Sequence, residues 1–195
     1  METNFAKEAF KKSFSPKQTQ LVLGTLLGDG YLVKTTRGYA LRINHSIKQK
    51  ELVDWKYNYL KDFVNSLPQR TDNSYYFRTI SHQLMFQLRS CFYRGRIKII
   101  PKFLMKTTFS QLSLAVWIMD DGAREGKQIR INSQSFTLNE NLWLIRFLSA
   151  KLGIYCTLNR DKNRFRLRVQ ANSMKKLIQS IKPYIIPSML YKLSL

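Results

Sequence analysis

The stretches LVLGTLLGDGYL (21–32) and LAVWIMDDGARE (114–125) share one design, an apolar and helix-like run that ends in Asp-Gly. Their aspartates, Asp29 and Asp121, lie 92 positions apart. If this spacing reflects an internal duplication, other segments must recur in the same order at a similar separation. The two stretches therefore provide a test of how the whole chain is organised.

Further segments pass this test, at separations of 86 to 90 residues. The matches are RIN at 42–44 and 130–132, the amphipathic helical stretches at 50–64 and 138–152, YYFRTIS (75–81) with FRLRVQA (165–171), and IIPKFL (99–104) with IIPSML (185–190). We infer a duplication in which each half reads helix, two strands, helix, two strands, helix.

Helix start and stop signals set the boundaries of the two halves. Ser15, Pro16 and Gln18 form a capping box for the first helix, and Gly30 is expected to be the left-handed residue just past its end. In the second half, Ser110 is the expected N-cap and Gly122 the terminator. We expect an N-terminal tail (1–14), a first half (15–105), a linker (106–110) and a second half (111–195).

The composition favours a folded protein that binds a polyanion. In 195 residues, 44% are hydrophobic and 13% aromatic, which is too much core-forming material for a disordered basic tail. The 33 Lys and Arg against 12 Asp and Glu give a net charge of +21. Such a charge is best neutralised by nucleic acid, which is therefore the expected partner.

A membrane is the competing partner, and the sequence argues against it. The basic residues are spread over the chain rather than gathered on one amphipathic helix. The longest apolar stretch, Leu21 to Leu27, is far shorter than a bilayer span, and no secretory segment is recognisable near residue 1. We expect an intracellular protein with no membrane partner.

Any metal must be bound by oxygen ligands. Only two histidines and two distant cysteines, Cys91 and Cys156, are present, so zinc-finger and HEXXH sites have no ligands, and both cysteines are expected in the core. One Asp-Gly is an ordinary helix-end dipeptide. However, Asp29 and Asp121 both stand near the negative end of a helix dipole, at a cost of roughly 0.3–1 kcal/mol each. Two carboxylates that both stand at this unfavourable end of a helix indicate a functional site. Mg²⁺ would relieve the repulsion between each carboxylate and its helix end.

Small residues would let the two helices approach closely. Gly24 and Gly28 lie on the first helix and Ala115 on the second, so a crossing at a pseudo-twofold axis would bring the aspartates together. The alternative is that the glycines only fit a crowded core. Neither a GxGxxG fingerprint nor a Walker GK[ST] motif is present, so no nucleotide cofactor is expected.

Alternating residues predict strands with one polar face, as in residues 164–170, where even positions are polar and odd positions apolar. Arg, Asn and Gln on such faces can contact base edges in the major groove, although a solvated sheet face is the alternative. The expected DNA-binding residues are Arg42, Asn44, Ser46, Tyr76, Arg78, Gln128, Arg130, Asn132, Gln134, Thr157, Asn159, Lys162, Arg164, Arg166, Arg168 and Gln170.

The two Asp-Gly helices resemble the signature helices of the LAGLIDADG homing endonucleases, of the single-chain, two-motif type encoded in organellar introns. The likeness extends to NSQSFT (132–137) and IKPYIIPSMLYKL (181–193). It implies an α+β fold with two pseudo-symmetric αββαββα halves. The signature helices would pack at the centre, and two four-stranded antiparallel sheets would form a DNA-binding saddle.

The resemblance also implies roles for individual residues. Asp29 and Asp121 become the catalytic metal ligands, assisted by the backbone of Gly28 and Asp120, and Lys98 becomes a basic residue that supports catalysis. The Asp120 side chain departs from the usual small residue and is interpreted as secondary.

The counterpart of Lys98 in the second half is not clear from the sequence. Tyr184 occupies the equivalent place, three residues before the proline of the IIP repeat. Lys162 or Arg164 from the expected hairpin is therefore the alternative basic residue.

The implied activity is site-specific cleavage of double-stranded DNA with Mg²⁺ or another divalent cation such as Mn²⁺. Each half would cut one strand across the minor groove of a long, nearly asymmetric site. The alternatives are a group I intron RNA maturase of the same fold and a non-catalytic DNA-binding regulator. A monomer that acts in an organelle is expected.

Overall fold

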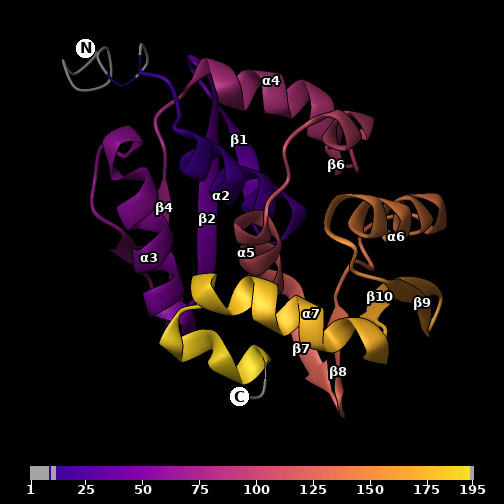
Figure 1. Cartoon of the computed structure of the whole chain (residues 1–195). Helices are drawn as coiled ribbons and strands as arrows, with labels where there is room; N and C mark the ends of the chain where they lie inside the picture. Colours follow the sequence, from indigo (N-terminus) through magenta and orange to yellow (C-terminus); the bar gives the residue numbers. More distant parts are fainter. Residues whose placement is uncertain (1–8, 10–11, 194–195) are drawn as a thin grey trace.

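The computed structural model describes Ala9 and residues 12–193, so most of the expected N-terminal tail lies outside the described residues. Each half contains the predicted order of helices and strands (Figure 1). The first half comprises α2 (Pro16–Leu27), β1 (Tyr31–Thr35), β2 (Gly38–Ser46), α3 (Lys50–Leu60), β3 (Gln69–Arg70), β4 (Ser74–Arg78) and α4 (Gln83–Phe92).

The second half repeats this order of helices and strands. It comprises α5 (Gln111–Asp121), β7 (Gly122–Glu125), β8 (Gln128–Ile131), α6 (Leu138–Leu152), β9 (Cys156–Asp161), β10 (Arg164–Val169) and α7 (Ala171–Ile181). In the first half, α4 is followed by a small hairpin of β5 (Tyr93–Arg94) and β6 (Ile97–Lys98) and by the 3₁₀ segment η3 (Lys102–Lys106). A similar 3₁₀ segment, η5 (Pro187–Lys192), follows α7, so both IIP repeats lead into a 3₁₀ turn.

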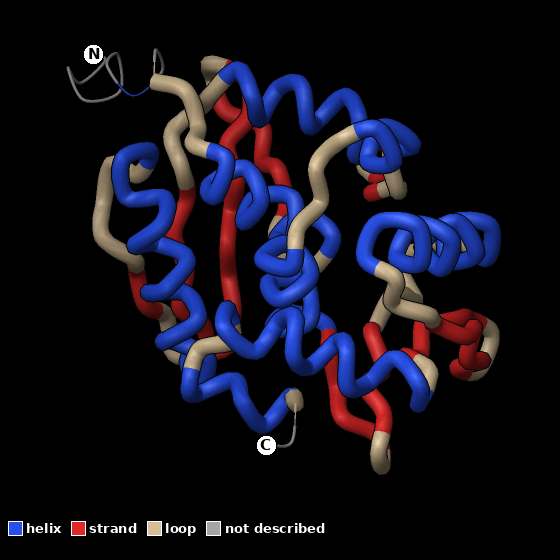
Figure 2. Tube along the Cα trace, in the orientation of Figure 1, coloured by secondary structure: helices blue, strands red, loops and turns tan. Residues whose placement is uncertain are grey.

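The two sheets have the same topology, which confirms the predicted α+β fold. Their strand orders are β1-β2-β4-β3 and β7-β8-β10-β9, with antiparallel pairing throughout. Helices cover one face of each sheet, where α3 and α4 pack on β2 and α6 packs on β9 and β10. The opposite face of each sheet is left to polar side chains. Figure 2 shows the two sets of strands on either side of the central helices.

Helices α2 and α5 cross at the centre of the molecule (Figure 1). The contact is so close that a Cβ atom on Gly28 would lie 2.6 Å from the Cβ of Asp120, and one on Gly24 would overlap the backbone of Ser113. Ala115 is fully buried in the same contact. The predicted close approach is confirmed, because only glycine leaves room for the facing helix at these two positions.

The helix ends confirm some of the expected caps and correct others. The Ser15 capping box with Gln18 forms as predicted. Gly30 is not a left-handed residue, because α2 ends at Leu27 with Gly28 as its C-cap and Gly30 has no positive φ. Ser110 is the N-cap of α5 but makes no side-chain capping bond. Gly122 ends α5 in an extended conformation, so the chain passes directly into β7.

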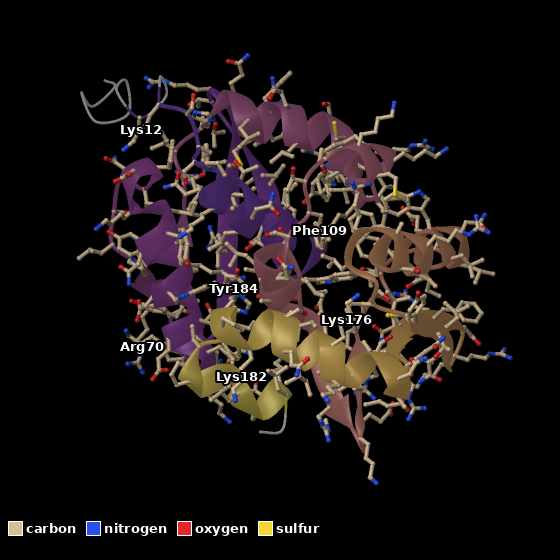
Figure 3. The ribbon with its side chains drawn as sticks, in the orientation of Figure 1. Lys12, Arg70, Phe109, Lys176, Lys182 and Tyr184 are labelled. Carbon is tan, nitrogen blue, oxygen red and sulfur yellow. The ribbon has the colours of Figure 1, made fainter. Side chains whose placement is uncertain are left out.

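The expected linker is packed against both halves. Phe109 is buried and its ring lies 4.9 Å from that of Phe147, between the halves (Figure 3). The side chain of Gln20 on α2 donates to the carbonyl of Thr108 and accepts from the amide of Ser110, each at 2.8 Å. These contacts fix the start of α5 relative to α2.

The two cysteines are free, with Cys156 buried and Cys91 half-buried. Across the described residues, 9 and 12–193, we find no helix of the length and apolarity that a membrane span requires.

Candidate functional site

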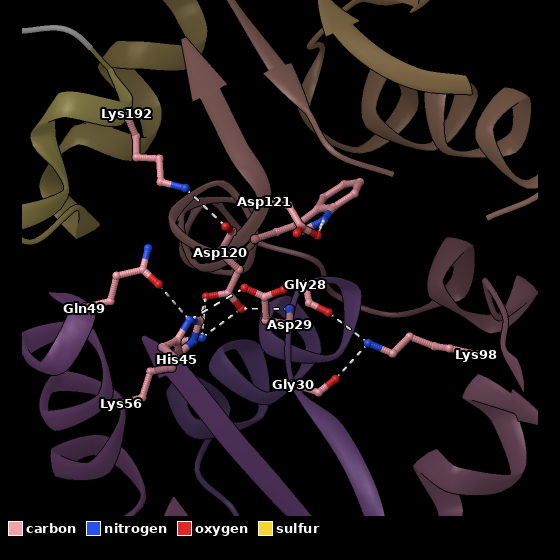
Figure 4. A network of polar contacts seen from close by, with 11 residues as sticks. Gly28, Asp29, Gly30, His45, Gln49, Lys56, Lys98, Asp120, Asp121 and Lys192 are labelled. Atoms are coloured by element: carbon pink, nitrogen blue, oxygen red, sulfur yellow. Dashed lines mark hydrogen bonds and ion pairs between the residues drawn. The ribbon is translucent and has the colours of Figure 1, made fainter. Parts of the chain in front are cut away.

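The two signature aspartates lie together at the end of the central helix pair (Figure 4). Asp29 follows the C-cap Gly28 of α2, and its amide donates to Oδ2 of Asp120 at 3.3 Å. Asp121 is the last residue of α5, and its Oδ2 accepts a bond from the indole of Trp117 at 3.2 Å. The helix crossing thus presents carboxylates from both halves to one region.

The two aspartates have different environments. The Asp29 side chain is about half exposed, at 48%. Asp121 is half-buried, and its desolvation, with the nearby carboxylates of Asp29 and Asp120, raises its pKa to about 8. The crowding of acidic groups that raises this pKa is what a divalent cation would relieve.

Two lysines approach this region in matching ways. Nζ of Lys98, on β6, donates to the carbonyl oxygens of Gly28 and Gly30, both at 2.8 Å. Nζ of Lys192, on η5, donates to the carbonyl oxygen of Asp120 at 3.2 Å. Because Gly28 and Asp120 occupy equivalent positions in the two motifs, Lys192 is the structural counterpart of Lys98. Burial lowers the pKa of Lys98, although the surrounding aspartates oppose this shift.

The structure offers Lys192 as a further candidate for the second basic residue. Lys162 and Arg164 are exposed at the β9–β10 turn, and Tyr184 is 37% exposed in the 3₁₀ segment Lys182–Tyr184 (Figure 3). Lys98 comes three residues before the proline of its IIP repeat, whereas Lys192 comes five residues after the corresponding Pro187. Aligning the two repeats does not identify Lys192, because the lysine beside the signature carbonyl comes from a different position of the repeat in each half.

Asp120, which is interpreted from the sequence as secondary, is the centre of a buried polar cluster. Nζ of Lys56, on α3, lies 2.6 and 2.8 Å from the two carboxylate oxygens of Asp120, and both side chains are fully buried. The ring of His45, on β2, lies 3.6 Å from Asp120 through Nε2 and 3.6 Å from Asp29 through Nδ1. Burial, then the charge of Lys56, lowers the pKa of His45.

A sequence signal for Lys56 exists but was not used. Lys56 shares the buried face of α3 with Leu52, Val53 and Leu60, so a lysine interrupts an otherwise apolar stripe. His45 likewise stands at an inward position of β2, after the buried Leu41 and Ile43. A charged residue at a core position of an amphipathic helix indicates a buried partner.

The donor set fits a hard divalent cation. The carboxylates of Asp29 and Asp121 and the carbonyls of Gly28 and Asp120 are all oxygen ligands, which suit Mg²⁺ or Mn²⁺. Ligand atoms of Asp29, His45 and Asp120 also lie within 4.8 Å of one another. However, Lys56 already neutralises the Asp120 carboxylate, so this side chain is a poor cation ligand.

The predicted DNA-binding residues of the first half share the polar face of their sheet. Arg42, Asn44 and Ser46 on β2 lie opposite Arg78, Tyr76 and Ser74 on β4. The Arg42 guanidinium carbon lies 4.3 Å above the centre of the Tyr76 ring. Ser46 also caps η1 (Ile47–Gln49), where its side chain accepts from the amide of Lys48.

In the second half, most predicted residues share one face, while some fall beyond the strands. Asn132 and Gln134 follow the end of β8 at Ile131, and Gln170 is the N-cap of α7 after β10 ends at Val169. Their alternation therefore does not continue a strand. The residues on the polar face are Gln128, Arg130, Thr157, Asn159, Arg164, Arg166 and Arg168, with Lys162 in the adjoining turn.

The sequence profile described as the LAGLIDADG DNA endonuclease family matches residues 19–177, which is most of the chain. The chain belongs to the LAGLIDADG DNA endonuclease family. The match runs through both signature helices and both sheets of this LAGLIDADG protein.

Individual relatives of this LAGLIDADG protein carry names of two kinds. The intron-encoded endonuclease ai4 of Dictyostelium discoideum is 33% identical, over 77% of this chain and 91% of that protein. The cytochrome b mRNA maturase bI2 of Debaryomyces hansenii is 28% identical, over 94% of this chain and 76% of that protein.

Solved structures share the fold of this LAGLIDADG protein. The homing endonuclease I-WcaI, bound to its DNA recognition sequence, superposes with a TM-score of 0.88 and 25% identity, covering 98% of this chain and 93% of that chain. I-DmoI, in complex with DNA and Mn, superposes with a TM-score of 0.52 and 19% identity, covering 85% and 96%. The second likeness concerns the fold alone.

Proposed function

We propose that this protein is a monomeric, site-specific homing endonuclease that hydrolyses both strands of double-stranded DNA in the presence of Mg²⁺. The observation that carries the proposal is the convergence of Asp29 and Asp121, from two separate halves, at the crossing of α2 and α5, between two sheets with basic polar faces. The family membership and the DNA-bound relative support the same activity.

In this proposal, each half of the internal repeat is one functional unit. The first half, 15–105, and the second half, 111–195, would each contribute one sheet to the DNA interface and one aspartate to the catalytic centre. The linker at 106–110 would join them into a single chain that needs no second copy. Names of relatives that refer to introns support origin from an intron, and we propose an organelle as its place of action.

The catalytic roles follow from the contacts of each side chain. Asp29 and Asp121 would bind the cation with the carbonyls of Gly28 and Asp120. A divalent cation held there would supply Lewis acidity to a phosphate oxygen and would lower the pKa of a water molecule. Lys98 and Lys192, which contact those two carbonyls, would place positive charge beside the scissile phosphates, where negative charge develops during hydrolysis.

The test is cleavage of a supercoiled plasmid that carries the intronless form of the host gene. Wild-type protein with Mg²⁺ is expected to linearise this plasmid at one position and to leave the empty vector intact. The Asp29→Asn/Asp121→Asn double variant is the control, since it keeps the shape of both side chains. Absence of cleavage by the wild type with Mg²⁺ and with Mn²⁺ would contradict the proposal.

A group I intron maturase is the second candidate function, favoured by the similarity to a cytochrome b mRNA maturase. The same double variant separates the two activities, because RNA binding does not need the catalytic carboxylates. If the variant and the wild type both accelerate splicing of the host intron while neither cuts DNA, the maturase is the function of the chain.

A further inference from the structure

The polar face of the second sheet carries two carboxylates among its arginines. Glu125 ends β7 and Asp161 ends β9, at opposite edges of the sheet. Antiparallel pairing places Glu125 opposite Gln128 and Asp161 opposite Arg164, so both side chains belong to the polar face. In contrast, the four described strands of the first sheet contain neither Asp nor Glu.

The two carboxylates hold the arginines of this face in an ordered network. Glu125 lies 3.0 Å from Nη1 of Arg130, 3.9 Å from Nη2 of Arg166 and 3.9 Å from Nε of Arg168. Asp161 lies 3.4 Å from Nη1 of Arg166, on the other side of that guanidinium. Arg166 is thus held between both acids, and its side chain is only 15% exposed.

Several polar atoms of this network lack a hydrogen-bond partner. The Nε atoms of Arg130, Arg166 and Arg168 and the Oε2 atom of Glu125 are buried and have no hydrogen-bond partner. The carboxylates therefore orient these guanidinium groups without satisfying them. Groups of this kind, which on the first sheet include the Nε atom of Arg42 and the Oδ1 atom of Asn44, are expected to find their partners in a ligand that covers the polar faces.

The two carboxylates indicate whether this face contacts the phosphates or the base edges of DNA. In a protein of net charge +21, a carboxylate on the DNA-facing surface repels phosphates and weakens the sequence-independent part of binding. Base edges carry no net charge, so they tolerate a nearby carboxylate. Base edges also bind well to guanidinium groups that are held in one orientation, since arginine contacts guanine through two parallel hydrogen bonds. A carboxylate can accept a hydrogen bond from the amino group of cytosine.

We propose that Glu125 and Asp161 are specificity-determining residues, which hold Arg130, Arg166 and Arg168 toward base edges and keep phosphates away from this face. The second half would then be the more selective half. The first sheet, with Arg42 and Arg78 and no carboxylate, would tolerate more sequence variation. This inference rests on the proposed function, and it deepens it by assigning unequal roles to the two sheets.

The test selects binding sites from a library of randomised 30-base-pair duplex DNA, with Ca²⁺ in place of Mg²⁺ to limit cleavage. Wild type, Glu125→Gln, Asp161→Asn and Glu51→Gln are compared. Glu51 is exposed on α3, which packs on the covered face of the first sheet, so its variant makes the same change in charge away from the proposed interface. An Arg78→Ala variant identifies which end of the selected site faces the first half.

Glu125→Gln and Asp161→Asn are expected to bind random duplex DNA more tightly than the wild type and to lose about tenfold in base preference at the end facing the second half. Preference at the other end is expected to stay unchanged. Glu51→Gln is expected to keep the preference at both ends.

Three results would overturn the inference. The two interface variants could keep the wild-type preference, lose affinity for all sequences equally, or match Glu51→Gln in every respect. Failure of the wild type to select any common sequence would be a different result, because it would contradict site-specific binding itself. Thermal unfolding of each variant establishes that the comparison is made between folded proteins.

Discussion

The ammonium group of Lys56 lies 2.6 Å from the carboxylate of Asp120, and both side chains are fully buried. Lys56 belongs to α3 of the first half, whereas Asp120 belongs to α5 of the second half. This ion pair therefore joins the halves directly beside Asp29, whose amide contacts the same carboxylate. It fixes the position of one signature helix end relative to the other half.

Breaking this ion pair is expected to destabilise the protein strongly. Lys56→Met leaves a buried carboxylate without its partner, at a cost of about 3–5 kcal/mol in the free energy of unfolding. Lys56→Met/Asp120→Asn removes both charges and is expected to lose less than the sum of the two single variants. Urea unfolding of the four proteins measures this coupling. Additive losses would show that the two side chains do not interact.

The signature aspartates are expected to be essential for cleavage and dispensable for folding. Asp29→Asn and Asp121→Asn should each abolish double-strand cleavage of a target plasmid while the protein still binds the site. Binding without metal is expected to be at least as tight as that of the wild type, because removing a carboxylate lowers the repulsion of phosphate. Chelation of the cation should reproduce both variants. Complete linearisation by either variant would mean that its aspartate is only a helix-end residue.

The raised pKa of Asp121 predicts a pH dependence of stability without metal. Its pKa is about 8 in the folded protein and near 3.8 when unfolded, so the folded state binds more protons between these values. The free energy of unfolding is therefore expected to fall as pH rises from about 4 to about 8, and to level off above this range. Asp121→Asn should lack this component. Urea unfolding at several pH values in EDTA compares the two proteins, and parallel curves would contradict the shift.

The two lysines at the carbonyls of the signature motifs are expected to support cleavage. Lys98→Met and Lys192→Met should each slow cleavage by about 10²-fold or more while target affinity stays close to that of the wild type. Lys162→Met is the comparison variant, since Lys162 is the competing candidate and lies exposed in the β9–β10 turn. Single-turnover cleavage with excess enzyme separates rate from affinity. A larger effect of Lys162→Met than of Lys192→Met would restore the hairpin as the source of the second basic residue.

Arginines on the two polar faces are expected to distinguish bases from phosphates. Truncation of Arg78 or Arg168 to alanine should cost about 1–3 kcal/mol of binding free energy and relax preference at one position, if the side chain contacts a base. The logarithm of the binding constant should fall linearly with the logarithm of the salt concentration, with a slope near −0.9 per phosphate contacted. Titrations of matched and mismatched duplexes at several salt concentrations measure both. Equal weakening of all duplexes would assign these arginines to phosphates.

The sequence alone determined the architecture. Periodicity, capping signals and internal repeats predicted the order of elements in both halves, the crossing of α2 with α5 and the meeting of Asp29 with Asp121. These features depend on local backbone preferences and on the burial of apolar stripes, which are written in short stretches of sequence. The sequence did not predict details such as the end of α2 at Leu27, because the position of a helix end depends on the contacts around it.

Tertiary packing decided which charged groups complete the site. Lys192 reaches the Asp120 carbonyl because η5 packs against α5, and its position in the second IIP repeat does not match that of Lys98 in the first. Lys56 and Asp120 lie 64 residues apart and become partners only when α3 and α5 bury them together. The interaction of a buried charge depends on its distance from groups elsewhere in the chain and on the loss of water around it, and neither quantity is encoded locally.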